Sequence, residues 1–188
     1  SEASNGDSIS GETSLGSLAA NKEITYNTAE MFTGIIPGSI YETSTLCIAV
    51  GALILILTKV ASWRIILSGI IGAAVMGMIF NALNIEGNGL TNFPWYQHII
   101  VGGFAFGIVF MATDPVSGAQ TTRGKWIYGF LIGLFGIMIR VFNPAYPEGI
   151  MLSILLLNVF APTIDHYVIQ GNVKKRQKRL QMKTVKTA

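Results

Sequence analysis

Residues Ile65–Ile85 read IILSGIIGAAVMGMIFNALNI, a stretch with no charged side chain. A helix that crosses the hydrocarbon core of a bilayer needs about 20 mainly apolar residues, so this stretch is long enough to span a membrane. The whole chain of 188 residues shares this character, because it is 51% hydrophobic and only 12% charged. Soluble domains carry about 25% charged residues. The sequence therefore predicts an all-α integral membrane protein.

Four further low-charge stretches accompany it, at Thr43–Thr58, roughly Gln97–Thr113, Trp126–Ile139 and Gly149–Ile164. Each reaches the length of a span when the charged residues beside it lie at the membrane interface. We therefore predict five transmembrane helices between residues 42 and 168. The fourth and fifth stretches are short enough to suit a buried or re-entrant segment as well.

The basic residues predict an orientation. With five spans, eleven of the thirteen share one side: Lys59, Arg64, Arg123, Lys125 and the seven from Lys174 to Lys186. The positive-inside rule places that side in the cytoplasm. The polar segment 1–41 then lies in the periplasm, and segment 169–188 is a basic cytoplasmic tail. Because the tail directly follows a span, attraction to anionic membrane lipid explains it better than a nucleic-acid site, and we expect no nucleic-acid partner.

Small residues recur within the predicted spans at helical spacing. Gly103 and Gly107 are four residues apart, as are Gly129 and Gly133. This spacing lets helix backbones approach closely in lipid, either within this chain or against other subunits. Cys47 is the single cysteine of the sequence, so this chain alone builds neither a disulfide framework nor a four-cysteine metal or iron–sulfur site.

Several motifs are more specific. They are ASWRI at 61–65, GGFAFG at 102–107 leading into MATDPVS at 111–117, NPAYPEG at 143–149 and IDHYV at 164–168. On these motifs the chain resembles the C-terminal half of the B subunit of the sodium-translocating NADH:quinone oxidoreductases (Na+-NQR), and more distantly the D subunit of the Rnf ferredoxin:NAD complexes. The resemblance implies half of a ten-helix, urea-channel-like inverted-repeat protein, and a chain that begins within a longer one.

The resemblance also implies a covalent flavin. In that family a threonine in a Ser-Gly-Ala-Thr motif, preceded by an aspartate, carries FMN through a phosphoester bond. The matching residue here is Thr13. Asp7 and the pair at 10–11 match the family, whereas Glu12 stands where alanine is usual, and Ser10 and Ser14 are alternative acceptors. A phosphoester leaves the isoalloxazine ring unmodified, so the redox chemistry stays that of the cofactor.

Two acidic residues are candidates for a sodium path. Asp114 and Asp165 end the third and fifth predicted spans, at the cytoplasmic face. An acid at the edge of a bilayer is costly and commonly marks an ion path, and sodium prefers oxygen ligands. The resemblance associates both positions with sodium uptake. The structural alternatives are an N-cap before Pro115 for Asp114, and a headgroup position beside His166 for Asp165.

Arg140 and Glu148 bracket the loop at 143–147 on the outer side. The Arg140 guanidinium has three candidate roles: an ion pair with Glu148, a contact with the FMN phosphate, or snorkelling toward the interface. His98 and His166 lack the spacing of metal ligands, and we predict both to be interfacial.

Taken together, the resemblance implies a subunit of a six-subunit NADH:ubiquinone reductase in the bacterial inner membrane. That complex moves Na⁺ out of the cytoplasm, and it contains riboflavin and a ubiquinone site as well as FMN. NADH oxidation is expected in another subunit, because this chain has no glycine-rich dinucleotide motif after a strand. Two alternatives stay open: an Rnf-type subunit, and a channel or secondary transporter of urea-channel-like fold without a redox role.

Overall fold

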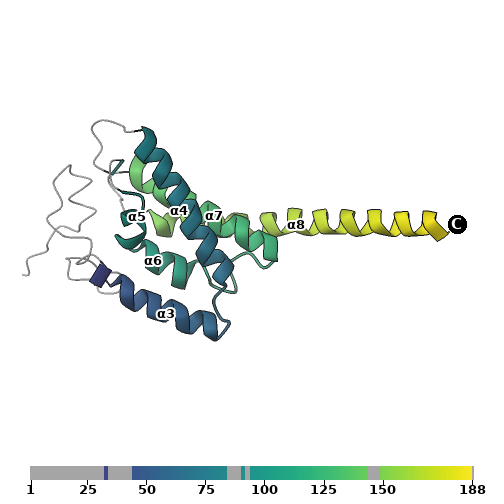
Figure 1. The fold of residues 1–188 in the computed structure, drawn as a ribbon, viewed down its shortest axis with the longest axis horizontal. Coiled ribbons are helices and arrows are strands. Elements are labelled where there is room, and N and C mark those ends of the chain that lie inside the picture. The colour runs from purple at the N-terminus through teal and green to yellow at the C-terminus, as the bar shows by residue number, and fades with distance from the viewer. Residues whose placement is uncertain (1–31, 34–43, 84–89, 92–93, 144–148, 188) are drawn as a thin grey trace, which may run out of the picture.

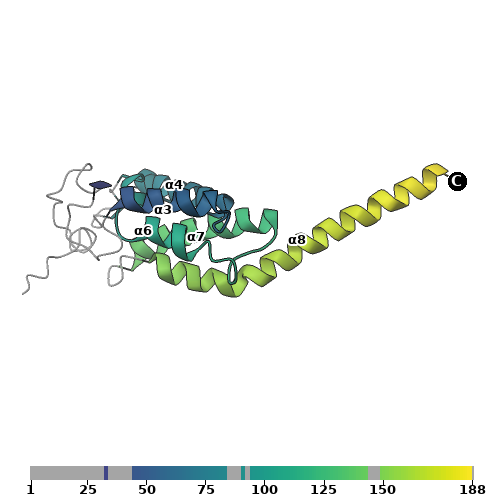
Figure 2. The same cartoon turned by 90° about the horizontal axis from the view of Figure 1, so that it is seen from below.

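The computed structural model describes residues 32–33, 44–83, 90–91, 94–143 and 149–187, and within these ranges every longer element is a helix. Figures 1 and 2 show the helical segments running back and forth between the two ends of one bundle. The elements are α3 (Thr45–Leu57), α4 (Trp63–Leu83), α5 (Gln97–Ile100), α6 (Phe104–Phe106), the π-helical turn η1 (Gly107–Met111), α7 (Thr122–Phe142) and α8 (Ile150–Thr187). The predicted all-α class is confirmed for the described residues.

Three of these helices are long and apolar enough to cross a membrane. They are α4, α7 and the part of α8 that covers Ile150–Met182. The chain is therefore a multi-pass membrane protein. The fourth and fifth predicted stretches, whose shortness also suited a re-entrant segment, both belong to these long helices. In contrast, α3 has 13 residues and a length of about 20 Å, which is less than the ~30 Å hydrocarbon core.

The third predicted helix is not continuous. α5 ends at Ile100, and the next helical residue is Phe104. Between them Gly102 and Gly103 have φ angles of 73° and 65°, a left-handed conformation that glycine adopts without steric cost. Two such residues in succession break the hydrogen-bond ladder of a helix. Hydropathy could not reveal this break, because the whole stretch is apolar.

Glycines let α4 and α7 approach to backbone contact. A Cβ atom added to Gly133 would collide with the carbonyl oxygen of Gly69 and would lie 2.7 Å from the backbone nitrogen of Ala73. One added to Gly129 would collide with the Ser68 hydroxyl. The close packing predicted from the Gly129–Gly133 spacing is therefore confirmed, and the partner helix belongs to this chain.

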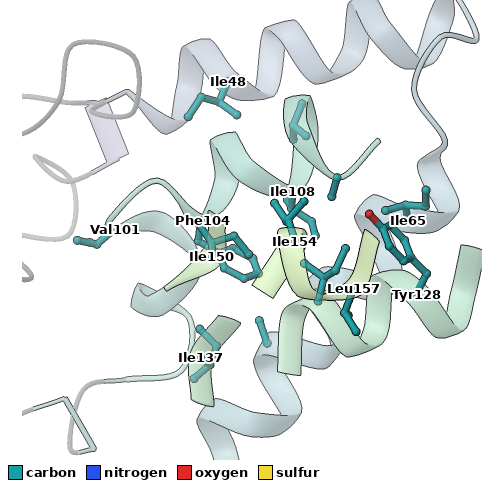
Figure 3. Packing of buried hydrophobic residues seen from close by; sticks show 14 of the residues in the cluster. Ile48, Ile65, Val101, Phe104, Ile108, Tyr128, Ile137, Ile150, Ile154 and Leu157 are labelled. Carbon is teal, nitrogen blue, oxygen red and sulfur yellow. The ribbon is translucent and has the colours of Figure 1, made fainter. Parts of the chain in front are cut away.

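The core joins the broken segment to α7 and α8. Figure 3 shows Phe104 and Ile108 beside Ile150 and Ile154 of α8, and all four are buried. The hydroxyl of the buried Ser153 donates a hydrogen bond of 3.1 Å to the carbonyl oxygen of Ile132 on α7. Because hydrophobic exclusion does not drive helices together in lipid, such packing and interhelical hydrogen bonds determine the arrangement.

α8 continues from the bundle into the basic tail as one helix of 38 residues. Pro162 lies inside it, and since proline has no N–H, the helical hydrogen bond to the Asn158 carbonyl is lost. Figure 2 shows α8 bent where it leaves the bundle, with its C-terminal part extending away from the other helices.

A matched pair of glycine substitutions tests the α4–α7 contact. Gly133→Ala adds a methyl group against the α4 backbone, and we expect it to destabilise the protein by about 1–3 kcal/mol through overpacking. Gly171→Ala adds the same group to α8, where nothing lies within 4 Å of it. This control should be neutral or slightly stabilising, because alanine favours helices over glycine. Thermal unfolding of the full-length protein in detergent measures both, and equal unfolding temperatures would contradict the contact.

Candidate functional site

Asp114 lies in the connection between η1 and α7, and its carboxylate binds Ser117. The Oδ2 atom accepts hydrogen bonds from the Ser117 hydroxyl at 2.7 Å and the Ser117 backbone N–H at 3.0 Å. These hydrogen bonds, side chain first, hold the pKa of Asp114 below its usual value. The backbone that follows is a turn and not a helix. Asp114 therefore caps a turn, and the N-cap of a short helix, which is the structural alternative for this residue, is wrong.

Asp165 fixes the beginning of α7 from the neighbouring helix α8. Its Oδ2 atom accepts from the Gln120 backbone N–H at 2.6 Å, and its Oδ1 atom accepts from the backbone N–H and the hydroxyl of Thr121 at 3.1 Å and 2.5 Å. Thr121 is itself the N-cap of α7 and accepts from the N–H of Gly124 at 3.0 Å. A carboxylate at this position also interacts favourably with the positive end of the helix dipole.

Gly124 is a site residue that sequence reasoning missed. A Cβ atom added there would collide with Asp165 Oδ1 and with Thr121 Oγ1. A glycine in the first turn of a helix lowers helix propensity, so its presence there was the one available signal. Glycine is needed at position 124 because the Asp165 carboxylate of α8 occupies the space that a side chain would fill.

A partly buried hydrogen bond links α7 to α8 near the two acids. The hydroxyl of the fully buried Tyr128 donates to the side-chain oxygen of Asn158, and Asp114 is close enough to act on Tyr128 electrostatically. Sequence reasoning missed this pair too, because the two residues lie on different helices and neither belongs to a recognisable spacing.

The site is rich in oxygen atoms, but protein donors already occupy the carboxylates. The Thr113 hydroxyl beside Asp114 donates to the Val109 carbonyl at 2.6 Å. In the described part of the chain, no three His, Cys, Asp or Glu side chains converge as they would around a metal ion. A monovalent cation at these carboxylates would compete with the donors of Ser117 and Thr121.

At the opposite end of α7, Arg140 binds the break in the third segment. Its guanidinium is 1% exposed and donates to the carbonyl oxygens of His98 at 2.6 Å and Gly102 at 3.0 Å. The Thr45 hydroxyl of α3 donates to the neighbouring Ile100 carbonyl at 3.2 Å. Arg140 therefore binds carbonyl groups within the protein instead of snorkelling. His98, which we predict to be interfacial, is also 1% exposed, so its side chain faces protein.

Several predicted site residues lie outside the described residues. Thr13, its neighbours Ser10 and Ser14, and Glu148 are among them. The flavin attachment and an ion pair between Arg140 and Glu148 therefore stay predictions.

Comparisons of the sequence with known proteins show which proteins this chain is similar to. Residues 2–174 match the family model described as the NQR2, RnfD, RnfE family. The chain is 51% identical over 177 residues to the B subunit of the Na(+)-translocating NADH-quinone reductase of Chromohalobacter salexigens, a match that covers 92% of this chain and 43% of that protein. Proteins with the same name from Ectopseudomonas mendocina and Yersinia pestis are each 51% identical over 92% of this chain, and the match covers 44% and 41% of them. The chain thus spans less than half the length of these curated relatives.

The Asp165 contacts predict unequal effects of two conservative substitutions. Asp165→Asn replaces one acceptor oxygen by a donor amide that faces the backbone N–H groups of α7, and we expect a loss of about 2 kcal/mol in stability. Asp114→Asn disturbs hydrogen bonds within one turn only and should cost less. Thermal unfolding of both full-length variants in detergent measures the difference. An equal loss in the two variants would contradict the assignment of Asp165 as the anchor of α7.

Proposed function

The chain belongs to the NQR2, RnfD, RnfE family, and from this premise we propose that it forms the C-terminal half of a membrane component of a bacterial sodium pump. The pump couples electron transfer from NADH to ubiquinone, through FMN on Thr13, to Na⁺ translocation out of the cytoplasm. The observation that carries this proposal is the 51% identity, over 92% of this chain, to relatives named as the B subunit of Na(+)-translocating NADH-quinone reductase. These names favour the sodium pump over an Rnf-type protein or a non-redox channel.

The proposal includes five membrane crossings. The three long helices account for three, and α3 and the broken segment α5–α6–η1 account for the others. Figures 1 and 2 support this count, because the α3–α4 turn, the 112–121 connection and the exit of α8 lie at one end of the bundle. Most basic residues belong to these three regions, so we place this end in the cytoplasm and Thr13 in the periplasm of the inner membrane.

The broken segment supports a transport role. Non-helical backbone at membrane depth is tolerated only where protein buries it or where it lines a cavity. Discontinuous helices of this kind form the ion and substrate sites of many transporters, and π-helical turns such as η1 are frequent at functional sites. The proposed path leads to Asp114 and Asp165 at the cytoplasmic end, where sodium would compete with the donors of Ser117 and Thr121.

The redox part of the proposal depends on groups that this chain does not supply. FMN provides the electron-transfer chemistry when it is bound, and the motif around Thr13 supports its attachment there. We assign NADH oxidation to a companion subunit of a six-subunit complex, and we expect riboflavin and ubiquinone to bind within that complex.

A test of covalent flavin addresses the function directly. The full-length protein is produced together with a flavin transferase, denatured and viewed by in-gel ultraviolet fluorescence. We expect fluorescence that survives denaturation, and its loss in Thr13→Val, because valine keeps the shape of threonine without the hydroxyl acceptor.

Ser10→Ala and Ser14→Ala serve as matched controls and should stay fluorescent. Peptide mass mapping of residues 1–41 then identifies the modified residue. A protein without fluorescence would contradict the redox proposal and would favour the channel or transporter instead. Fluorescence that persists in Thr13→Val and disappears in a serine variant would show that this serine, and not Thr13, carries the flavin.

A further inference from the structure

A polar pocket of about 220 Å³ opens at the end of the bundle where α3 turns into α4. Three basic side chains line it, Lys59, Arg64 and Lys125. The first two flank the turn, whereas Lys125 comes from the first turn of α7. The hydroxyl-bearing Ser62 is the other polar residue of the lining, and none of the lining residues is acidic.

The lining of the pocket has an excess of positive charge. Within the part of the chain that the structure describes, none of the three side chains forms an ion pair. Asp165 attracts Lys125 electrostatically and offsets part of its charge, whereas the pocket lining contains no acidic residue beside Lys59 and Arg64. Like charges in one pocket repel each other, so this arrangement favours an anion between them.

The surroundings of the pocket are apolar. Val60 and Trp63, which also line it, are 56% and 48% exposed. The Trp63 ring meets Trp126 edge to face at 6.0 Å between centroids, and the Arg64 guanidinium lies 5.3 Å from the centre of the Trp63 ring. Tryptophan gathers at the level of lipid headgroups. A ligand here therefore meets a basic pocket and an exposed apolar rim together.

We propose that this pocket binds the phosphate group of an anionic phospholipid, with the acyl chains along the rim formed by Val60 and Trp63. Basic pockets between transmembrane helices are known to hold anionic headgroups. Free phosphate offers the same charge but would leave the apolar rim uncovered, which favours the lipid. The site goes beyond the proposed function and needs only the membrane fold, so its test is independent of flavin and of redox activity.

Native mass spectrometry of the full-length protein in its complex tests this site. The complex is released from nanodiscs that contain phosphatidylglycerol and phosphatidylcholine, and retained lipids are counted. The test variant combines Lys59→Asn, Arg64→Gln and Lys125→Gln. Asparagine suits position 59, because Lys59 has a φ angle of 59° and asparagine tolerates that region better than most residues. Each lost charge should weaken lipid binding roughly fivefold.

The matched control removes three charges from the exposed tail of α8, by Lys174→Gln, Lys175→Gln and Arg176→Gln. These residues attract anionic lipid to the membrane surface but line no pocket, so the complex should not depend on them to retain a lipid after its release from the nanodisc. Loss of phosphatidylglycerol from the pocket variant, but not from the tail variant, would support the site. Three results would overturn the site. The two variants could retain equal amounts of phosphatidylglycerol, they could lose equal amounts of it, or the native protein could retain as much phosphatidylcholine as phosphatidylglycerol. Binding of inorganic phosphate without phosphatidylglycerol would overturn the lipid assignment. If the triple variant does not assemble, Lys59→Asn alone should show the roughly fivefold loss.

Discussion

The hydrogen bonds from Arg140 to the broken third segment are the interaction on which the bundle depends. Inside a bilayer no water is available to backbone carbonyl groups, and each unsatisfied group costs several kcal/mol. The break around Gly102 exposes such groups, and Arg140 binds two of them, on His98 and Gly102. Thr45 binds a third, on Ile100. Side-chain donors from α3 and α7 therefore satisfy carbonyl groups that the interruption of the helix leaves without helical partners.

The helix α7 makes polar contacts at both of its ends. α7 carries Arg140 in its last turn, and its first turn is fixed through Thr121 by Asp165 of α8. Between these ends, Gly133 brings α7 against the backbone of α4. A displacement of α7 along its axis would therefore disturb both the proposed cytoplasmic ion site and the donors at the break.

Hydropathy and glycine spacing predicted those parts of the fold that depend on composition. The helices α4 and α7 and the apolar part of α8 follow from their apolar length. The close approach of α7 to a neighbour follows from Gly129 and Gly133, but their spacing did not identify α4 as that neighbour. The break at Gly102 depends on backbone angles, which an apolar stretch does not reveal. The roles of Arg140 and Asp165 depend on partners from distant segments, and no local pattern shows which carbonyl or N–H group a side chain will reach.

Hydrogen–deuterium exchange of the assembled complex in nanodiscs tests the role of Arg140 most directly. The comparison is between the native chain and Arg140→Lys, which keeps the charge but loses the two-pronged guanidinium. The account predicts faster exchange in peptides that cover residues 97–111 and unchanged exchange in α4. Unchanged exchange in residues 97–111, or an equal increase in α4, would contradict it.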